Sequence, residues 1–290
     1  MTGATGFIGT HLVRALVGRE VVAITRAGSD TSVFRELGVT PVRAELDDEE
    51  TLAEALRGCD ALVHLAGGGL RNPHETWRLN AEGTAHALNA CRRAAVRRFL
   101  LASTVTVTRR RVAAYGASKR EAEREALASG LDATVFRFAF VYGPGRTGVF
   151  ARLVQLARSL PVVPVVGSGK LDIAPVYVDD VVSAIVAALD RPHTAGKIYT
   201  LAGPPAAFDD VVQGVLARLG VRKRTLHVPA PAALLLARAL ERMPSAPITR
   251  DNVLGITQEA DHDSSLARAE LGFSPRPLRE GLDATFVPQS

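Results

Sequence analysis

The sequence predicts an α/β protein with a doubly wound (Rossmann) parallel sheet and a small carboxyl-terminal substrate lobe. Three observations indicate this fold. Short apolar runs alternate with helix-period segments, a glycine-rich turn opens the chain, and the alternation loosens after about residue 143. The 290 residues are 47% hydrophobic and 22% charged, enough to bury a large core.

Five apolar runs are expected to form buried strands, at 21–24, 39–42, 61–66, 99–102 and 134–138. Helices are expected at 8–17 and 49–57, because Gly18 and Gly58 follow them at the position where a left-handed residue ends a helix. Residues 176–178, with Asp179 as the N-cap of a helix to Leu189, add another β/α unit. The Rossmann domain is therefore expected over 1–145 and 172–202, and the substrate lobe over 146–171 and 203–290.

The glycine-rich turn has the spacing GxxGxxG and runs directly into a helix. Its residues are Gly3, Thr5, Gly6, Phe7, Ile8 and Gly9. Glycines allow a tight turn and close approach to a pyrophosphate, and a helix N-terminus offers free N–H groups to it. The turn predicts a dinucleotide site, with a plain turn as the alternative.

The first strand of this fold is apparently missing from the chain. A buried strand should lead into the glycine turn at the centre of the sheet, yet only Met1 precedes Thr2. Either residues upstream of Met1 supply that strand or another segment fills the gap, and we favour the first explanation.

The end of the run 21–24 bears on the choice of cofactor. Arg26 lies where an NAD-preferring protein has an acid against the ribose 2′-hydroxyl. An arginine there favours the 2′-phosphate of NADP, with NAD possible if Arg26 is only an exposed turn residue. Glu45 and Leu46, after the run 39–42, are expected to border the adenine, and Asp48 is either part of that border or a helix cap.

Tyr115 and Lys119 are the candidate catalytic pair. Residues i and i+4 share a helical face, so the phenol and the ammonium point the same way. A free phenol has a pKa near 10, and a neighbouring cation lowers it toward the range of a useful acid or base. Ser103 and Thr104 end the preceding strand, where a hydroxyl can hold a substrate carbonyl or alcohol.

Other classes of protein are disfavoured. Cys59, Cys91 and seven scattered histidines form neither a disulfide framework nor a metal site. No apolar run reaches the roughly 18 residues of a membrane span and no leader is visible, so we expect a cytoplasmic protein. The arginine pairs are expected to be solvated, without nucleic-acid binding.

Two segments remain open in interpretation. The run Arg109–Arg111 lies in the short loop between Thr104 and Tyr115, where it would attract an anionic substrate or the cofactor. The apolar helix expected at 232–243 either packs in the second lobe or contacts a membrane surface or a partner, which would suit a lipid-like substrate.

Taken in order, these motifs resemble the extended or atypical branch of the short-chain dehydrogenase/reductase superfamily, of the NAD(P)-dependent epimerase/dehydratase type. The resemblance also includes Val63-His64-Leu65-Ala66-Gly67, Asn80-Ala81-Glu82-Gly83-Thr84, Val141-Tyr142-Gly143-Pro144-Gly145 and Val176-Tyr177-Val178-Asp179-Asp180. The resemblance implies that Tyr115 is the acid/base, that Lys119 modifies its pKa and binds the ribose, and that Thr104 is the substrate hydroxyl, with Ser103 as second choice. It further implies that Leu65, Ala66 and Gly67 contact the cofactor through their backbone. Asn80 would hold the geometry of sheet and helix, and Val141 would lie near the nicotinamide.

Two departures narrow the function that the resemblance implies. The loop from Thr104 to Tyr115 is shorter than extended members usually have, and Ile173-Ala174-Pro175 stands where sugar-nucleotide members commonly carry an arginine. Three segments, 175–180, 196–204 and 247–252, are also similar to atypical members related to an accessory subunit of respiratory complex I. We therefore expect an oxidoreductase, epimerase or dehydratase acting on an alcohol or carbonyl, or else a non-catalytic NADP(H)-binding structural or assembly protein.

Overall fold

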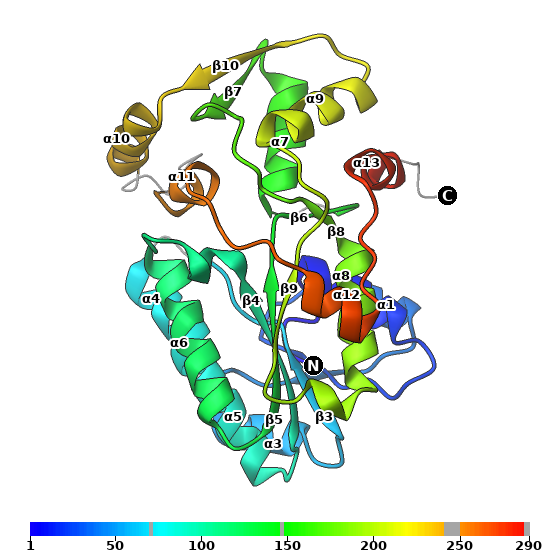
Figure 1. Ribbon diagram of the computed structural model, residues 1–290. Coiled ribbons are helices and arrows are strands. Elements are labelled where there is room, and N and C mark those ends of the chain that lie inside the picture. The colour runs from blue at the N-terminus through cyan, green and yellow to red at the C-terminus, as the bar shows by residue number, and fades with distance from the viewer. Residues whose placement is uncertain (70–71, 146–147, 241–249, 287–290) are drawn as a thin grey trace.

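A parallel sheet made of a two-stranded and a four-stranded part organises the first lobe of the protein (Figure 1). The computed structural model describes residues 1–69, 72–145, 148–240 and 250–286. In spatial order the strands are β2 (Pro41–Arg43), β1 (Ala23–Thr25), β3 (Ala61–His64), β4 (Arg98–Thr104), β5 (Asp132–Phe138) and β9 (Ile198–Leu201). β4 and β5 are almost entirely buried, which explains why the sequence shows them as continuous apolar runs.

Met1 and Thr2 occupy the centre of this sheet. Thr2 pairs in parallel with Ile24 of β1 on one side and with His64 of β3 on the other. The Ile24 N–H donates to the Met1 carbonyl at 2.9 Å, and the Thr2 N–H donates to the Val63 carbonyl at 3.0 Å. The gap expected from the sequence is therefore bridged by two residues, and the backbone pairing runs across the whole sheet.

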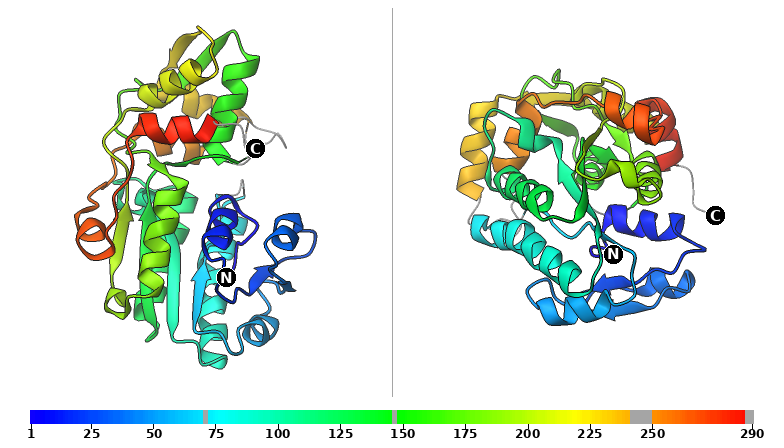
Figure 2. Two further views of the ribbon diagram at one scale, coloured as in Figure 1. Left: turned by 90° about the vertical axis from the view of Figure 1, so that its right-hand side faces the viewer. Right: turned by 60° about the horizontal axis from the view of Figure 1, so that its bottom comes forward.

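Helices cover both faces of the sheet, as Figures 1 and 2 show. One face carries α3 (Glu49–Ala55), α5 (Gly83–Arg93) and α6 (Ala114–Ala128), with α4 (Pro73–Trp77), the π-helical turn η1 (Arg78–Glu82) and the short η2 (Val105–Thr108) beside α6. The other face carries α1 (Phe7–Ala15), α2 (Ser32–Glu36), α8 (Val178–Leu189), with η3 (Pro192–Thr194) after it, and α12 (Ser265–Leu271). Each layer buries its own apolar core against the sheet.

The second lobe lies beyond the carboxyl ends of the strands (Figure 1). It contains the helices α7 (Gly148–Ser159), α9 (Phe208–Arg218), α10 (Ala230–Leu240), α11 (Arg250–Thr257) and α13 (Leu278–Phe286), and the parallel pair β7 (Val162–Val166) and β10 (Arg224–Val228). The pair β6 (Val141–Tyr142) and β8 (Val176–Tyr177) connects it to the first lobe. The helix expected over 232–243 is α10, and residues 241–243 lie outside the described residues.

The expectation that Asp179 caps α8 was wrong. The backbone is extended up to Tyr177, which takes the N-cap position, so α8 begins at Val178 and Asp179 lies inside its first turn. The Asp179 carboxylate instead meets the His11 ring of α1, at 2.8 Å between Oδ1 and Nδ1. His11 Nε2 lies 3.0 Å from the Pro144 carbonyl, so this ring joins α1 to α8 and to the turn after β6.

Candidate active site

The glycine turn is shaped by backbone contacts that exclude side chains. Gly3 has φ of +67°, and a Cβ there would lie 2.6 Å from the Ala66 nitrogen. A Cβ on Gly9 would lie 2.1 Å from the Gly3 carbonyl oxygen. Gly6 is the N-cap of α1, with no side-chain cap and no acidic residue in the first turn. The N-terminus of α1 thus presents backbone N–H groups and positive dipole character to an anion.

The two residues after Gly6 pack toward the second lobe. The Phe7 ring lies against Gly145, where an added Cβ would come within 3.0 Å of it. Ile8 packs against the cores of both lobes. Val141, the first residue of β6, is partly buried between the same two cores.

An open hollow of about 560 Å³ adjoins the glycine turn. It is lined by Thr5, Arg26, Ala27, Gly28, Ser29, Asp30 and Glu45. Glu45 Oε1 accepts a hydrogen bond from the Ala27 N–H at 2.9 Å, and Asp30 Oδ1 accepts one from the Ser32 N–H at 3.0 Å. The hollow therefore combines an exposed arginine with carboxylates that already hold backbone donors.

The neighbouring residues have local structural contacts. The Leu46 carbonyl oxygen lies 2.9 Å from His86 Nδ1 on α5. Asp48 is the N-cap of α3 and accepts from the N–H groups of Glu50 and Thr51, so the cap reading of Asp48 is confirmed. The shape of the glycine turn fits the pyrophosphate of a dinucleotide, and the hollow beside it fits the adenosine end.

The segment after β3 is held against α6 by Asn80. This fully buried residue lies in the π-helical turn η1, and its Oδ1 accepts from the Gly68 N–H at 3.0 Å. Its Nδ2 donates to the Gly68 carbonyl at 2.9 Å and contacts Ser118 Oγ at 3.0 Å. A Cβ on Gly67 would lie 2.7 Å from Asn80 Oδ1 and 2.8 Å from Lys119 Nζ. A side chain at position 67 would therefore have to displace the Asn80 amide or the Lys119 amine.

The same end of β3 contacts the glycine turn. The Leu65 N–H donates to the Thr2 carbonyl, and the Ala66 N–H donates to the Thr2 hydroxyl, both at 3.3 Å. Leu65, Ala66 and Gly67 thus run from the glycine turn to the side chains of Asn80 and Lys119.

Lys119 is buried under the first turns of α6. Its Nζ donates to the Ala102 carbonyl of β4 at 2.9 Å. Burial lowers the pKa of Lys119 to about 8, and the nearby Glu123 carboxylate opposes that decrease. Tyr115, one turn earlier, is partly exposed, and its ring lies 3.7 Å from where Gly69 would carry a Cβ. Tyr115 and Lys119 thus both lie at the carboxyl ends of β3 and β4.

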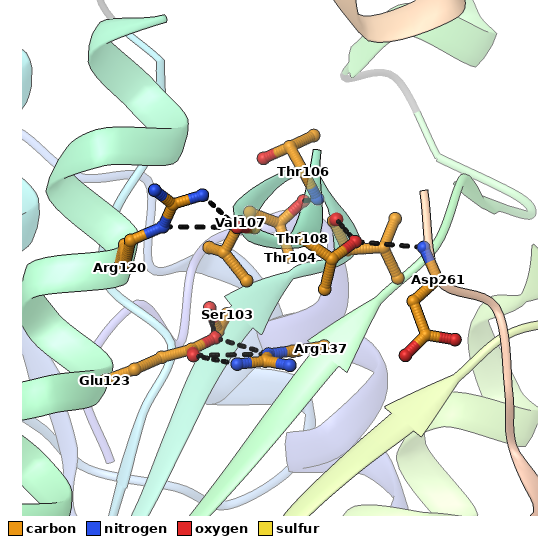
Figure 3. Close-up of polar contacts among 10 residues, drawn as sticks. Ser103, Thr104, Thr106, Val107, Thr108, Arg120, Glu123, Arg137 and Asp261 are labelled. Carbon is orange, nitrogen blue, oxygen red and sulfur yellow. Dashed lines mark hydrogen bonds and ion pairs between the residues drawn. The ribbon is translucent and has the colours of Figure 1, made fainter. Parts of the chain in front are cut away.

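Ser103 and Thr104 have different surroundings (Figure 3). The Ser103 hydroxyl donates to Glu123 Oε1 at 2.5 Å, and the Glu123 carboxylate pairs with Arg137 Nη2 at 2.6 Å. The Thr104 hydroxyl accepts a hydrogen bond from the Thr106 N–H at 3.2 Å and caps η2. A hydroxyl that accepts in this way keeps its own proton to donate.

The short loop between Thr104 and Tyr115 is tied to the second lobe. Arg109 donates to the Gly255 carbonyl of α11, and burial lowers the pKa of Arg109 to about 10. The Thr108 hydroxyl accepts from the Asp261 N–H at 2.9 Å (Figure 3). The Arg111 N–H donates to Gln258 Oε1 at 3.2 Å. The loop is therefore bonded to α11 and to the segment that follows it.

Glu123 is the member of this site that the sequence reasoning missed. A signal was present, because Glu123 follows Lys119 by the same four residues by which Lys119 follows Tyr115. Its partner Ser103, however, is contributed by β4, and no spacing in the sequence predicts that contact.

The described ranges contain neither a candidate metal cluster nor a membrane-spanning helix. Within them, no group of three His, Cys, Asp or Glu side chains is close enough to hold a metal ion. No helix in the described part of the chain has the length and apolarity needed to cross a bilayer.

Two relatives of known activity align with nearly the whole chain. Ceramide reductase of Caulobacter vibrioides is 29% identical, over 99% of this chain and 89% of that protein. The 4-hydroxy-2-methyl-3-oxo-4-farnesyl-3,4-dihydroquinoline-1-oxide ketoreductase of Stigmatella aurantiaca is also 29% identical, over 98% of this chain and 94% of that protein.

Solved structures share the same architecture. The crystal structure of gox2253 superposes with a TM-score of 0.81 and 25% identity, covering 98% of this chain and 95% of that one. MoeE5 in complex with UDP-glucuronic acid and NAD has a TM-score of 0.77 and 27% identity, covering 98% and 96%.

The relatives correct one part of the resemblance. They are reductases, dehydrogenases and epimerases rather than complex I subunits, so the expected kinship with the complex I accessory subunit is wrong. Of the two functions that the sequence left open, the relatives support the enzyme. The protein is an enzyme that binds NAD(P) and acts on a small molecule by reductase or epimerase chemistry. Residues 1–202 match the family model, and the chain belongs to the NAD dependent epimerase/dehydratase family.

Proposed function

We propose that this enzyme is an NADP(H)-dependent reductase of a carbonyl group in a lipid-like small molecule. The observation that carries the proposal is the buried Lys119 ammonium one helical turn after Tyr115 on α6, at the strand ends where the glycine turn also lies. The lipid-like class is supported by two relatives, one named a ceramide reductase and the other a farnesyl-quinoline ketoreductase.

Arg26 and Ser29 support NADP over NAD. Both line the hollow beside the glycine turn, where a guanidinium and a hydroxyl would bind a 2′-phosphate. Glu45 accepts from the Ala27 N–H and borders the adenosine end, together with Leu46. The hollow remains open enough for NAD as a weaker cofactor.

Tyr115 is the proton donor in this proposal. When bound, the nicotinamide supplies the hydride, and the chain's own residues handle the proton. The Tyr115 hydroxyl gives its proton to the carbonyl oxygen, and the Lys119 charge makes the phenolate that remains less costly. The Thr104 hydroxyl donates a hydrogen bond to the same oxygen, which stabilises the charge that develops there.

Lys119, Asn80 and Ser103 have supporting roles. Lys119 also binds a cofactor ribose hydroxyl, while Leu65, Ala66, Gly67 and Val141 border the cofactor with backbone and apolar groups. Asn80 holds the segment after β3 in place for that contact. Because the Ser103 hydroxyl donates to Glu123, we assign it to positioning and not to substrate.

The test is NADPH oxidation with a panel of long-chain 3-oxo lipids, short oxo esters and sugar nucleotides. We expect turnover with the long-chain ketones, faster with NADPH than with NADH. Tyr115→Phe should keep cofactor affinity and lose turnover, because only the ionisable oxygen is removed. Turnover confined to sugar nucleotides, or an active Tyr115→Phe variant, would contradict the proposal.

A further inference from the structure

His11 lies where α1, α8 and the turn after β6 meet. Its side chain is 11% exposed, and the Phe7 ring packs edge-on against it, with the ring centres 5.5 Å apart. The turn is closely packed on both sides: a Cβ on Gly143 would lie 2.5 Å from Val178 Cγ1 of α8, and a Cβ on Gly145 would lie 3.0 Å from the Phe7 ring. The imidazole is therefore a polar group in a tight and largely enclosed junction.

Both ring nitrogens of His11 face hydrogen-bond acceptors. Nδ1 lies 2.8 Å from Asp179 Oδ1, and Nε2 lies 3.0 Å from the Pro144 carbonyl oxygen. The hydrogen bond with His11 lowers the pKa of Asp179, against the opposing effect of burial, so this carboxyl is ionised and accepts. A carboxylate and a carbonyl have no proton to donate, so neither partner can give one to the ring.

A neutral imidazole cannot satisfy both contacts. It carries one N–H and one lone pair, so in either tautomer the lone pair would face an oxygen at 2.8 or 3.0 Å. The doubly protonated ring donates at both positions, and its charge pairs with the Asp179 carboxylate. The contacts therefore select the imidazolium form of His11.

The other charges near this junction leave that pairing in place. Arg14 of α1 and Arg276 both contribute to the lowered pKa of Asp179. Arg276 is itself paired with Asp180, at 2.8 Å between Nη2 and Oδ1. The turn residues 143–145 carry no ionisable side chain. Within the described part of the chain, the carboxylate at position 179 is the charged group that bonds to the ring.

We propose that the His11 imidazolium is a proton-dependent clamp that positions the glycine turn for cofactor binding. Gly6 and Phe7 begin α1 one turn before His11, and the turn after β6 leads into the second lobe. The protonated ring bonds these elements to one another through Pro144 and Asp179. When the proton leaves, one of the two hydrogen bonds is lost and a lone pair faces an oxygen. His11 is thus a positioning residue that acts through α1.

Thermodynamic linkage makes the clamp measurable in both directions. If the protonated form binds the cofactor better, the affinity falls as the pH rises through the His11 titration. By reciprocity, the bound cofactor moves that titration to higher pH. Loss of one charge-assisted hydrogen bond corresponds to about a tenfold change in affinity. The clamp goes beyond the proposed reductase function, because it concerns the cofactor whichever substrate is reduced.

The first experiment is nitrogen NMR of the full chain with 15N-labelled histidine, titrated from about pH 5.5 to about pH 9 with and without NADH. The signals of His11 are those lost in His11→Gln or His11→Asn. We expect both ring nitrogens to carry a proton at the acid end, and NADH to move the titration upward by about one pH unit. NADH is the probe because it lacks the 2′-phosphate, a group that itself titrates at about pH 6.

Asp179→Asn separates the charge from the contact. An amide at this position can donate to Nδ1, so the neutral ring keeps both hydrogen bonds, with Nε2 donating to Pro144. In fluorescence titrations, the NADH Kd of the parent divided by that of Asp179→Asn should rise about tenfold across the His11 titration. Lys119 titrates in both proteins, so its effect cancels in this ratio. His193→Gln, at an exposed histidine of η3, is the matched control and should behave as the parent does.

Two results would overturn the proposal. One is a His11 ring that is neutral at the acid end or whose titration NADH does not move. The other is the same pH dependence of NADH affinity in the parent and in Asp179→Asn, which a role in packing alone would produce. Thermal melting shows whether Asp179→Asn keeps the fold, and the NMR of the parent decides the question if it does not. No substrate enters either experiment, so a failure of the proposed lipid reduction would leave both results unchanged.

Discussion

At the scale of single residues, the charge of Lys119 makes the site sensitive to pH. Its ammonium is buried and bonded to the Ala102 carbonyl, and its pKa is lowered to about 8. Glu123 supports the charged form from one turn away, and Arg137 and Ser103 hold Glu123 in place. A lysine that loses its charge near pH 8 limits the acid/base chemistry of its neighbours at alkaline pH.

We predict that kcat/KM for carbonyl reduction falls as the pH rises above about 8, where Lys119 loses its proton. Glu123→Gln removes the carboxylate that raises the pKa of Lys119, so the decline should begin at lower pH. Ser103→Ala is the control, because Arg137 still pairs with the Glu123 carboxylate and keeps its charge near Lys119, so the profile should not shift. pH profiles of the three proteins test this, and a profile unchanged in Glu123→Gln would rule the idea out.

Arg26 is the residue on which cofactor choice depends in our proposal. Arg26→Ala should weaken NADPH binding by about 1.5 to 3 kcal/mol, roughly 10- to 150-fold in Kd, and NADH binding far less. Arg43→Ala is a suitable control, because Arg43 is also exposed but lies outside the hollow. Fluorescence titration with both cofactors measures the effect, and equal weakening of the two would contradict the assignment.

At the scale of elements, the close approach of the segment after β3 to α6 decides where the Lys119 amine lies. Gly67 has φ of +154°, and Asn80 and Lys119 fill the space beside its Cα. Gly68 is the next residue, yet a Cβ there would meet nothing within 4 Å. Two adjacent glycines therefore differ sharply in what a methyl group would do.

Gly67→Ala should lower kcat/KM roughly 100-fold, because the added methyl displaces the Lys119 amine by a fraction of an ångström or more. Gly68→Ala should stay within a few-fold of the parent enzyme. Steady-state kinetics together with thermal melting of both variants separate a displaced amine from a lost fold. A Gly67→Ala enzyme as active as the Gly68→Ala enzyme would show that this approach is not needed.

At the scale of the whole molecule, the sheet depends on a buried histidine beside its central residues. His64 is fully buried, its Nδ1 lies 2.9 Å from the Thr2 hydroxyl, and burial lowers its pKa to about 3. In the unfolded chain the pKa of histidine is about 6.5, so the unfolded state binds more protons between pH 3 and 6.5. Stability from this residue is complete above about pH 6.5 and is lost as the pH falls below it.

Between pH 7 and pH 5 this histidine should cost the protein about 2 kcal/mol of unfolding free energy. His64→Gln cannot titrate, and it should lose that much less over the same interval. His74→Gln, at an exposed histidine, should behave as the parent protein does. Urea unfolding at both pH values makes the comparison, and equal losses in all three proteins would refute the prediction.

The parts of the molecule predicted from sequence are those encoded by short-range pattern. The glycine spacing predicted the turn before α1, and the four-residue spacing of Tyr115 and Lys119 predicted their common helical face, because turns and helices depend on neighbours along the chain. Tertiary structure decided the rest. It decided that Met1 and Thr2 pair with strands on both sides and that the Asp179 carboxylate meets His11. It also decided that the Ser103 hydroxyl bonds to Glu123 and that Arg109 bonds to the Gly255 carbonyl. Each of these contacts joins segments distant in sequence, and a polar group's partner is set by which groups the packing buries together, which no local spacing records.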